Sequence, residues 1–356
     1  MKILVVRLRL IGDVVFTTPL LRGLRRRYPE AHIAYVVEPA AAPVVQGNPH
    51  LNEVIVAPRA RGLARITADI SLARRLRRGR FDIAIDLHGG PRSAWLTWSS
   101  GAPMRIGYTI PGREWMYTHR VERSPDLAPR HSVLTQWDLL GPLGIEACDP
   151  SRDAVEMMAD STVSARLDHR LRAVDIRPEH RVIVIHVSAG NAFRRWPPES
   201  FRDVVVALVR RDPCRRVILT AGPSDRDAAR SIGDAARRKL GPLASSVPDI
   251  GELDLPELRA LMARTAVYIG GDSGPLHIAA TTTVPIVELL GPTLPERSRP
   301  WRDARWYSET LDVGALPCRP CRQRHCVPGD YRCLTGITAE RVTEAAERAM
   351  TFEAHV

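Results

Sequence analysis

The sequence contains no long apolar run, almost no lysine and few aromatic residues. None of its apolar stretches approaches the ~18 residues that a membrane-spanning helix needs. The N-terminal stretch MKILVVRLRL carries Arg7 and Arg9 where a signal peptide would be apolar, so we interpret it as a buried strand. We therefore expect a cytoplasmic protein whose contact with a membrane is at most peripheral.

The sequence also lacks G-x-G-x-x-G after the first strand of either half, which disfavours a simple dehydrogenase. Its formal net charge of +11 comes almost wholly from arginine, because Lys2 and Lys239 are the only lysines. Such a surplus suits phosphate-rich partners such as nucleotide sugars, nucleic acid or an anionic membrane surface. Solvated arginine-rich helix faces explain the charge equally well. No nucleic-acid motif accompanies the arginines, so we expect no nucleic-acid partner.

The length of 356 residues is typical of two domains, and buried strands alternate with helical segments in both halves. This alternation predicts right-handed βαβ units and parallel sheets, so the expected fold class is α/β with two Rossmann-like domains. The predicted strands are 2–6, 32–37, 53–56, 81–87, 182–187, 217–220 and 267–269, with helices at 14–27 and 66–78 in the first half. We place the first domain at 1–165, a linker at 166–180, the second domain at 181–337 and a last helix at 338–356.

The most informative stretch is 267–293, VYIGGDSGPLHIAATTTVPIVELLGPT. A strand ends at Gly270-Gly271, and Ser273 stands where it can cap a helix that begins at Gly274. Bare amides at a helix start suit an anion such as a diphosphate. Asp272 repels that anion but accepts hydroxyl hydrogen bonds, and His277 lies one turn along the same helix face. The stretch therefore predicts a site for a phosphate next to a sugar.

Other candidate residues lie where further strands end, and each has a structural alternative. Asp13, after Gly12, is a candidate general base or a helix N-cap. Arg194 and Arg195 precede a predicted helix start, and the residues alone favour an arginine paired there with Glu199. Asp225 accepts ribose hydroxyls or caps the helix after it. The sequence leaves these alternatives open.

Two basic loops follow predicted strands of the first half, at the sheet edge where open α/β sheets bind ligands. The candidate acceptor-binding residues in these loops are Arg59, Arg61, Arg65, His88 and Arg92. The alternative for each arginine is a solvated surface position.

Four cysteines form the compact pattern Cys318-x2-Cys321-x4-Cys326-x6-Cys333 in a loop rich in proline and arginine. The spacing allows one tetrahedral ion, so a structural zinc is a candidate. Free thiols and a reversible disulfide are the alternatives.

The motif D-S-G-P-x-H-x-A-A, followed by V-P-x-V and G-P-T, resembles the donor site of glycosyltransferase family 9, the ADP-heptose:lipopolysaccharide heptosyltransferases. The pair Gly12-Asp13, the R-W-P stretch at 195–197 and the cysteine loop occur in the family's order. The resemblance implies a GT-B fold, in which the two domains face each other across a cleft and the last helix returns to the first domain. It also implies that Asp13 is the general base. It assigns the diphosphate to Ser188, Arg194 or Arg195 and the start of the helix at 273–274, and the sugar to Asp272 and His277.

The resemblance implies inverting transfer of a heptose from ADP-heptose to a lipid A-linked inner-core acceptor, a reaction that needs no cofactor. It places the enzyme in the cytoplasm, with peripheral contact at the inner face of the inner membrane. The alternatives are another donor sugar or glycan acceptor within the family, and a nucleotide-sugar epimerase on the same scaffold.

Overall fold

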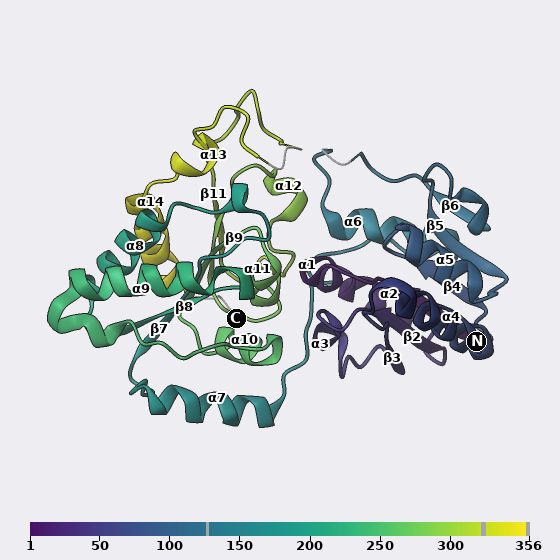
Figure 1. Cartoon of the computed structure of the whole chain (residues 1–356), viewed down its shortest axis with the longest axis horizontal. Coiled ribbons are helices and arrows are strands. Elements are labelled where there is room, and N and C mark those ends of the chain that lie inside the picture. Colours follow the sequence, from purple (N-terminus) through teal and green to yellow (C-terminus); the bar gives the residue numbers. More distant parts are fainter. Residues whose placement is uncertain (126–127, 322–324, 354–356) are drawn as a thin grey trace. The chain divides into compact units, whose positions relative to one another are not determined.

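The computed structural model describes residues 1–125, 128–321 and 325–353. The chain forms two compact units, Met1–Met158 and Ala159–Val356 (Figure 1). Each unit is a parallel β-sheet with helices packed on it. The predicted class, α/β with two Rossmann-like domains, is confirmed.

Unit 1 contains a six-stranded sheet in the order β3-β2-β1-β4-β5-β6, and all of its strand pairs are parallel. The order reverses between β1 and β4, which makes their carboxyl ends the switch point where such sheets bind ligands. The strands are β1 Lys2–Val6, β2 His32–Val37, β3 Glu53–Val56, β4 Ile83–Asp86, β5 Met104–Tyr108 and β6 His119–Val121.

The α-helices of unit 1 are α1 Ile11–Val15, α2 Thr18–Arg27, α3 Ala42–Val45, α4 Gly62–Gly79, α5 Pro91–Ser99 and α6 Ser132–Trp137. The described residues of this unit also form two 3-10 helices, η1 Glu114–Met116 and η2 Asp138–Leu143. The prediction of a single helix at 14–27 was wrong. Pro19 lacks the amide hydrogen that would continue α1, and a new helix starts with Pro19 in its first turn.

Unit 2 contains a five-stranded parallel sheet in the order β11-β10-β9-β7-β8. The strands are β7 Arg181–His186, β8 Arg215–Thr220, β9 Val267–Gly271, β10 Ile286–Leu289 and β11 Ser308–Leu311. The α-helices are α7 Ser161–Ala173, α8 Pro198–Arg211, α9 Arg226–Leu240, α10 Leu255–Met262, α11 Gly274–Ala279, α12 Pro295–Ser298, α13 Arg332–Thr335 and α14 Ala339–Thr351. The 3-10 helices are η3 Ala192–Arg194, η4 Pro223–Asp225 and η5 Gly241–Ser246.

The predicted domain boundaries need two corrections. The linker placed at 166–180 is largely helix α7, which buries Leu167 and Leu171 and packs against α10. Arg166 and Arg170 bind Glu257 of α10, so the polar composition that suggested a linker belongs to an ion-paired helix. The division between the units lies earlier, after Met158.

The second correction concerns the last helix. The apolar face of α14, predicted to pack toward the first domain, lies in the core of unit 2. This helix contacts α8 and the strands β9, β10 and β11. Small residues on that face, Ala345, Ala346 and Ala349, allow the close approach to the sheet.

Within the described residues, every helix is too short or too polar to cross a membrane.

Candidate active site

The carboxyl end of β9 holds a hydrogen-bonded cluster around Asp272. Arg194 Nη1 donates to Asp272 Oδ2 at 3.2 Å, and Thr293 Oγ1 donates to the same oxygen at 3.0 Å. His277 Nε2 lies 3.6 Å from the other carboxylate oxygen. Burial alone would raise the pKa of Asp272, but His277, Arg194 and Thr293 outweigh it and lower the pKa below its ordinary value. The carboxylate is therefore charged and held in one orientation.

Ser273 occupies the N-cap position of α11, as predicted, but its side chain does not cap the helix. Its hydroxyl instead donates to the carbonyl of Gly271 at 3.1 Å. Within the described part of the chain, the amides of Ser273 and Gly274 have no hydrogen-bond acceptor. Both amides are thus available to an anion beside Asp272.

Arg194 and Arg195 have different partners, a distinction that the sequence left open. Arg194 contacts Asp272, whereas Arg195 Nη2 lies 2.7 Å from Asp225 Oδ1. The alternative in which Arg194 pairs with Glu199 was wrong, since the loop before α8 directs its guanidinium toward the end of β9 instead.

Ser188 follows β7, which pairs with β9, and Asp225 follows β8, the edge strand on the other side of β7. The Ser188 hydroxyl accepts a hydrogen bond from the amide of Gly222 at 2.8 Å. Asp225 stands at the N-cap of α9 but forms no side-chain cap bond. The predicted donor-binding residues of unit 2 thus lie along one edge of its sheet.

One register row near this edge is polar on four of the five strands. Its successive partners are Thr220, His186, Gly270, Glu288 and Thr310, and only Gly270 lacks a polar side chain. Thr310 Oγ1 donates to Glu288 Oε2 at 2.8 Å, and His186 Nδ1 lies 3.0 Å from Thr220 Oγ1. Burial, reinforced by the charge of Asp272, raises the pKa of Glu288 to about 8. Burial lowers the pKa of His186 to about 4. Both side chains are therefore mostly neutral at pH 7.

Sequence reasoning missed Glu288. The available signal was an acidic residue inside the otherwise apolar strand IVEL, which is unusual because burying a carboxylate is costly.

In unit 1, the candidate base Asp13 forms an ion pair with Arg7. Arg7 Nη2 lies 2.5 Å from Asp13 Oδ2, and Arg7 Nη1 donates to the carbonyl of Leu87 at 2.6 Å. Asp13 lies inside α1, where its carboxylate accepts a long hydrogen bond of 3.5 Å from the amide of Leu10. The N-cap position belongs to Leu10, so the N-cap alternative for Asp13 was wrong. A third of the Asp13 side chain remains exposed, at 33%.

A second acidic residue, Asp86, organises the turn after β4. Its buried carboxylate accepts hydrogen bonds from the amides of His88 and Gly89, from Ser93 Oγ and from Tyr117 OH. Burial, and next the charge of Arg7, lower the pKa of His88, while Asp86 and Asp13 oppose the shift. The His88 imidazole is therefore mostly neutral at pH 7, and it follows β4, one of the two strands at the switch point of the unit 1 sheet. Sequence reasoning missed Asp86, which reads as one more residue of the strand FDIAIDL.

The other candidate acceptor residues divide into two groups. Arg92 is held inside unit 1, bonded to Glu38 at 3.0 Å, to Asp69 at 2.6 Å and to the carbonyl of Pro58 at 2.8 Å. Arg59, Arg61 and Arg65 are exposed around the start of α4. The structure gives Arg92 a structural role and leaves the other three facing solvent.

The four cysteines of the loop 318–333 are free thiols. Within residues 1–125, 128–321 and 325–353, the His, Cys, Asp and Glu side chains form no group of three or more that could hold a metal ion. The structural zinc at these four cysteines therefore stays a prediction. Burial, and next the neighbouring thiols of Cys326 and Cys318, raise the pKa of Cys333.

Arg319 joins this cysteine loop to the Asp272 cluster. Its Nε and Nη2 atoms donate to the carbonyl of Thr293 at 3.1 and 2.8 Å. Its Nη1 atom lies 2.8 Å from Asp312 Oδ2 and donates to Gly314. The residue whose hydroxyl binds Asp272 is therefore fixed by the cysteine loop.

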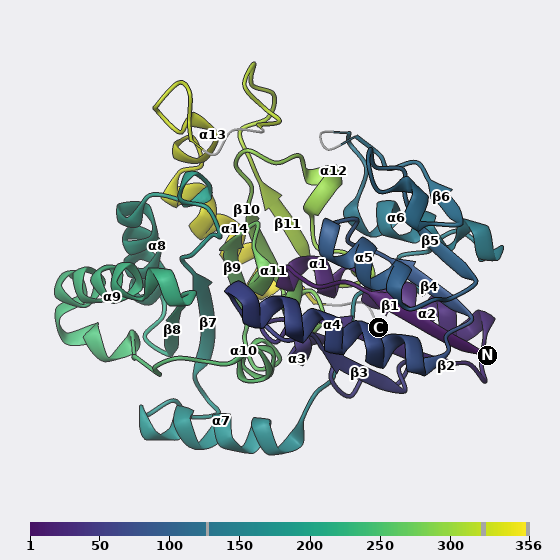
Figure 2. The same cartoon turned by 45° about the vertical axis from the view of Figure 1, so that its right-hand side comes forward.

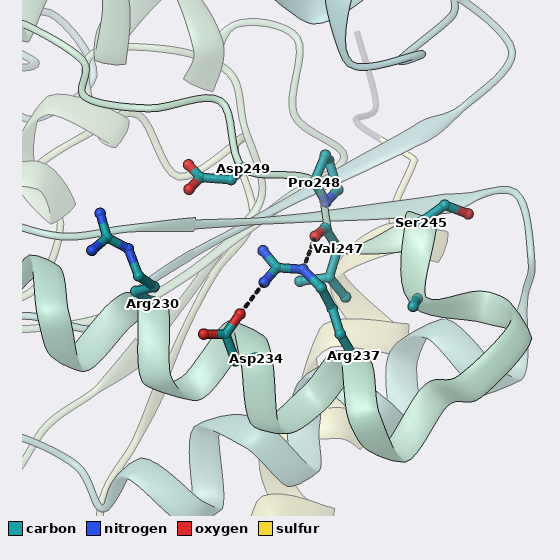
Figure 3. Close-up of a pocket in the computed structure, with 8 residues that line it drawn as sticks. Arg230, Asp234, Arg237, Ser245, Val247, Pro248 and Asp249 are labelled. Atoms are coloured by element: carbon teal, nitrogen blue, oxygen red, sulfur yellow. Dashed lines mark hydrogen bonds and ion pairs between the residues drawn. The ribbon is translucent and has the colours of Figure 1, made fainter.

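A pocket of about 540 Å³ lies elsewhere on unit 2, between α9 and the segment 244–249. Figure 3 shows Arg237 bonded to Asp234 of the same helix and to the carbonyl of Val247 in the facing segment. None of the candidate residues lines it. We therefore assign the chemistry to the strand ends instead.

Comparison with known proteins identifies the family. The model for "Glycosyltransferase family 9 (heptosyltransferase)" matches residues 70–332, more than half of the chain. The chain belongs to glycosyltransferase family 9. This membership makes it a glycosyltransferase, as predicted, and the predicted GT-B fold class is confirmed as well.

Full-length relatives agree with the family 9 assignment. The chain is 28% identical to lipopolysaccharide heptosyltransferase 3 of Escherichia coli (strain K12), over 98% of this chain and 97% of that protein. It resembles the crystal structure of a family 9 glycosyl transferase from Veillonella parvula DSM 2008, with a TM-score of 0.83, 25% identity and coverage of 98% and 97%. The structure of E. coli ADP-heptose lps heptosyltransferase II superposes with a TM-score of 0.76 at 22% identity, covering 98% of each chain.

Proposed function

We propose that this family 9 protein transfers a heptose from ADP-heptose to the inner core of a lipid A-linked lipopolysaccharide acceptor, with inversion at the anomeric carbon. The observation that carries the proposal is the Asp272 cluster, in which a fixed carboxylate stands beside Arg194 and two amides without acceptors. The names of the relatives, lipopolysaccharide heptosyltransferases, support both the donor and the acceptor.

The donor's two chemical parts match the two kinds of group at the end of β9. A diphosphate accepts hydrogen bonds from the amides of Ser273 and Gly274 and from an arginine such as Arg194. The sugar hydroxyls donate to the Asp272 carboxylate, and His277 orients that carboxylate. Asp225, paired with Arg195, is the proposed acceptor for the ribose hydroxyls.

Asp13 acts as the general base in this proposal. As the acceptor oxygen bonds to the anomeric carbon of the donor, its proton passes to the Asp13 carboxylate and the bond from that carbon to the phosphate oxygen breaks. ADP leaves with the electron pair of that bond. Arg7 holds Asp13 in place, and the pair lies at the switch point of the unit 1 sheet.

The leaving ADP gains negative charge, and Arg194 and the two amides are placed to stabilise it. We therefore propose a reaction that requires no metal ion. A structural zinc at Cys318, Cys321, Cys326 and Cys333 is a separate proposal, under which a chelator lowers thermal stability and leaves the transfer chemistry intact.

We propose a cytoplasmic location, with peripheral contact at the inner face of the inner membrane. A lipid A-linked acceptor is anchored in that membrane, and the basic surface of unit 1 suits its phosphates.

The test is incubation with ADP-heptose and a truncated lipopolysaccharide acceptor, with ADP release and the mass of the product measured with and without a chelator. We expect one heptose per acceptor, acceptor-dependent ADP release and no loss of rate with the chelator. A panel of other nucleotide sugars tests the alternative donors. Consumption of donor without acceptor would instead indicate the epimerase and contradict the proposal.

A further inference from the structure

Helix α4 of unit 1 has an apolar stripe that faces solvent. Leu63, Ile66 and Ile70 are exposed by 81%, 56% and 38%. Their spacing of three and four residues places them on one face of the helix. The second half of α4 behaves differently, because Leu72 and Leu76 are buried in the core beneath it. The stripe is therefore additional to the face that packs on the sheet.

Arginines surround this stripe. Arg59 and Arg61 precede the helix, Arg65 lies in its first turn, and all three are exposed. Among the described residues, Arg59 and Arg61 have no ion-pair partner, and Arg65 lies 3.8 Å from Asp69. Arg74, four residues after Ile70, extends the exposed face with another positive charge.

We propose that the stripe of Leu63, Ile66 and Ile70, with Arg59, Arg61 and Arg65, docks unit 1 onto an anionic lipid bilayer. Apolar side chains flanked by arginines on a surface helix fit the boundary between headgroups and acyl chains. This inference rests on the proposed function, since it names the surface that brings the enzyme to a membrane-anchored acceptor.

The charge pattern favours a bilayer over a second copy of the chain. A symmetric dimer through this face would bring two sets of arginines together, and the neighbouring Asp69 is already bonded to Arg92 of its own unit. A bilayer containing anionic lipids supplies both apolar contact and negative charge.

The position of the stripe also fits this role. α4 follows the carboxyl end of β3, the same sheet edge that carries Asp13 after β1 and His88 after β4. Figure 2 shows α4 on the near side of the unit 1 sheet. Docking through the first half of α4 therefore brings the edge with the candidate base close to the headgroups.

The test measures co-sedimentation of the full chain with vesicles of phosphatidylethanolamine and phosphatidylglycerol, and with vesicles of phosphatidylcholine alone. We expect binding to the anionic vesicles only. The variant Leu63→Ser/Ile66→Ser/Ile70→Ser loses at least tenfold in affinity, and so does Arg59→Gln/Arg61→Gln/Arg65→Gln. Two matched controls bind as the wild type: Val327→Ser, an apolar position in unit 2 that is 68% exposed, and Arg172→Gln/Arg230→Gln/Arg238→Gln, which changes three exposed arginines of unit 2.

The rate of heptose transfer to a deacylated acceptor in solution tests the proposed function without the docking surface, so it separates the two proposals. The apolar-stripe variant should keep its rate with that acceptor and lose rate only with acceptor embedded in vesicles. If the wild type bound vesicles but transferred nothing, the proposed function would fail while the docking surface stood. Failure of the wild type to bind anionic vesicles, or undiminished binding by the stripe variant, overturns the docking proposal. So does a dimeric wild type that the stripe substitutions convert to monomers, because the surface would then join two copies.

Discussion

Arg7 and Asp13 form an ion pair of 2.5 Å at the switch point of the first sheet. If Asp13 is the general base, Asp13→Asn should lower kcat by about 10²- to 10⁴-fold, the usual contribution of general base catalysis. ADP affinity should stay within about twofold, because the residues proposed to hold ADP lie on unit 2. Steady-state kinetics and calorimetric titration with ADP measure the two effects. Glu30→Gln, at an exposed carboxylate of the same unit, is the control. Loss of ADP affinity in step with activity would mean that Asp13 has a structural role.

Arg7 should act through Asp13. Arg7→Gln leaves the carboxylate without its partner, so we expect a fall in kcat with little change in the donor KM. The substitution should have almost no further effect in an Asp13→Asn background, because residues that act as a unit are not additive. Equal effects of Arg7→Gln in both backgrounds would contradict the coupling.

Asp272 should show the opposite pattern, with donor binding affected first. Asp272→Ala removes the acceptor proposed for the sugar hydroxyls and leaves Arg194 without its partner. Thr293→Val removes one hydrogen bond to the carboxylate, worth about 1 kcal/mol, which corresponds to roughly a fivefold rise in the donor KM. We expect a larger rise for Asp272→Ala than for Thr293→Val. Unchanged donor KM in both variants would remove Asp272 from the donor site.

The sequence predicted the strands that carry this site better than the side-chain contacts within it. The strands were predictable because buried parallel strands are nearly continuous apolar runs, such as VIVIHV before Ser188. Their carboxyl ends then brought Ser188, Asp225 and Asp272 to one edge. The partner of Arg194 was not predictable, because it is 78 residues away and local sequence offered Glu199 instead.

The errors have a similar physical origin. The polar surface of α7 suggested a linker, but its charges are satisfied by Glu257 on α10, which is far along the chain. The roles of Glu288 and Asp86 were not predicted, because burying a carboxyl group is favourable only with suitable neighbours. Asp86 is stabilised by hydrogen-bond donors such as Tyr117. Glu288 accepts a hydrogen bond from Thr310 and remains protonated. Such neighbours become visible only once the strands are in register.

Arg319 should influence the donor through Thr293. Its guanidinium fixes the Thr293 carbonyl, and the Thr293 hydroxyl binds Asp272. We expect Arg319→Ala to raise the donor KM several-fold in the wild type and to have much less effect in a Thr293→Val background. Arg332→Ala, at an exposed arginine of the same loop, should leave the KM unchanged. Additive effects of Arg319→Ala and Thr293→Val in this double-mutant cycle would show that Arg319 only stabilises the loop.

The buried Glu288 should make the free energy of unfolding depend on pH. Burial raises its pKa from the ordinary 4.5 to about 8, so between these values the folded protein keeps a proton that the unfolded chain releases. The contribution of Glu288 is therefore complete below about pH 4.5, declines as pH rises and is lost above about pH 8. Glu288→Gln keeps a neutral side chain at every pH. The free energy of unfolding of this variant, minus that of the wild type, should therefore increase as pH rises from 5 to 8, by on the order of a few kcal/mol in total.

Urea unfolding at several pH values between 5 and 9, followed by far-UV circular dichroism, measures this difference. For the control Glu340→Gln, at an exposed carboxyl of unit 2, the free energy of unfolding should differ from that of the wild type by the same amount at every pH. A difference between Glu288→Gln and the wild type that does not change with pH would show that Glu288 is charged when the protein is folded. In that case Asp272 would share its surroundings with a second negative charge, and the proposed diphosphate site would lose the excess of positive groups on which donor binding depends.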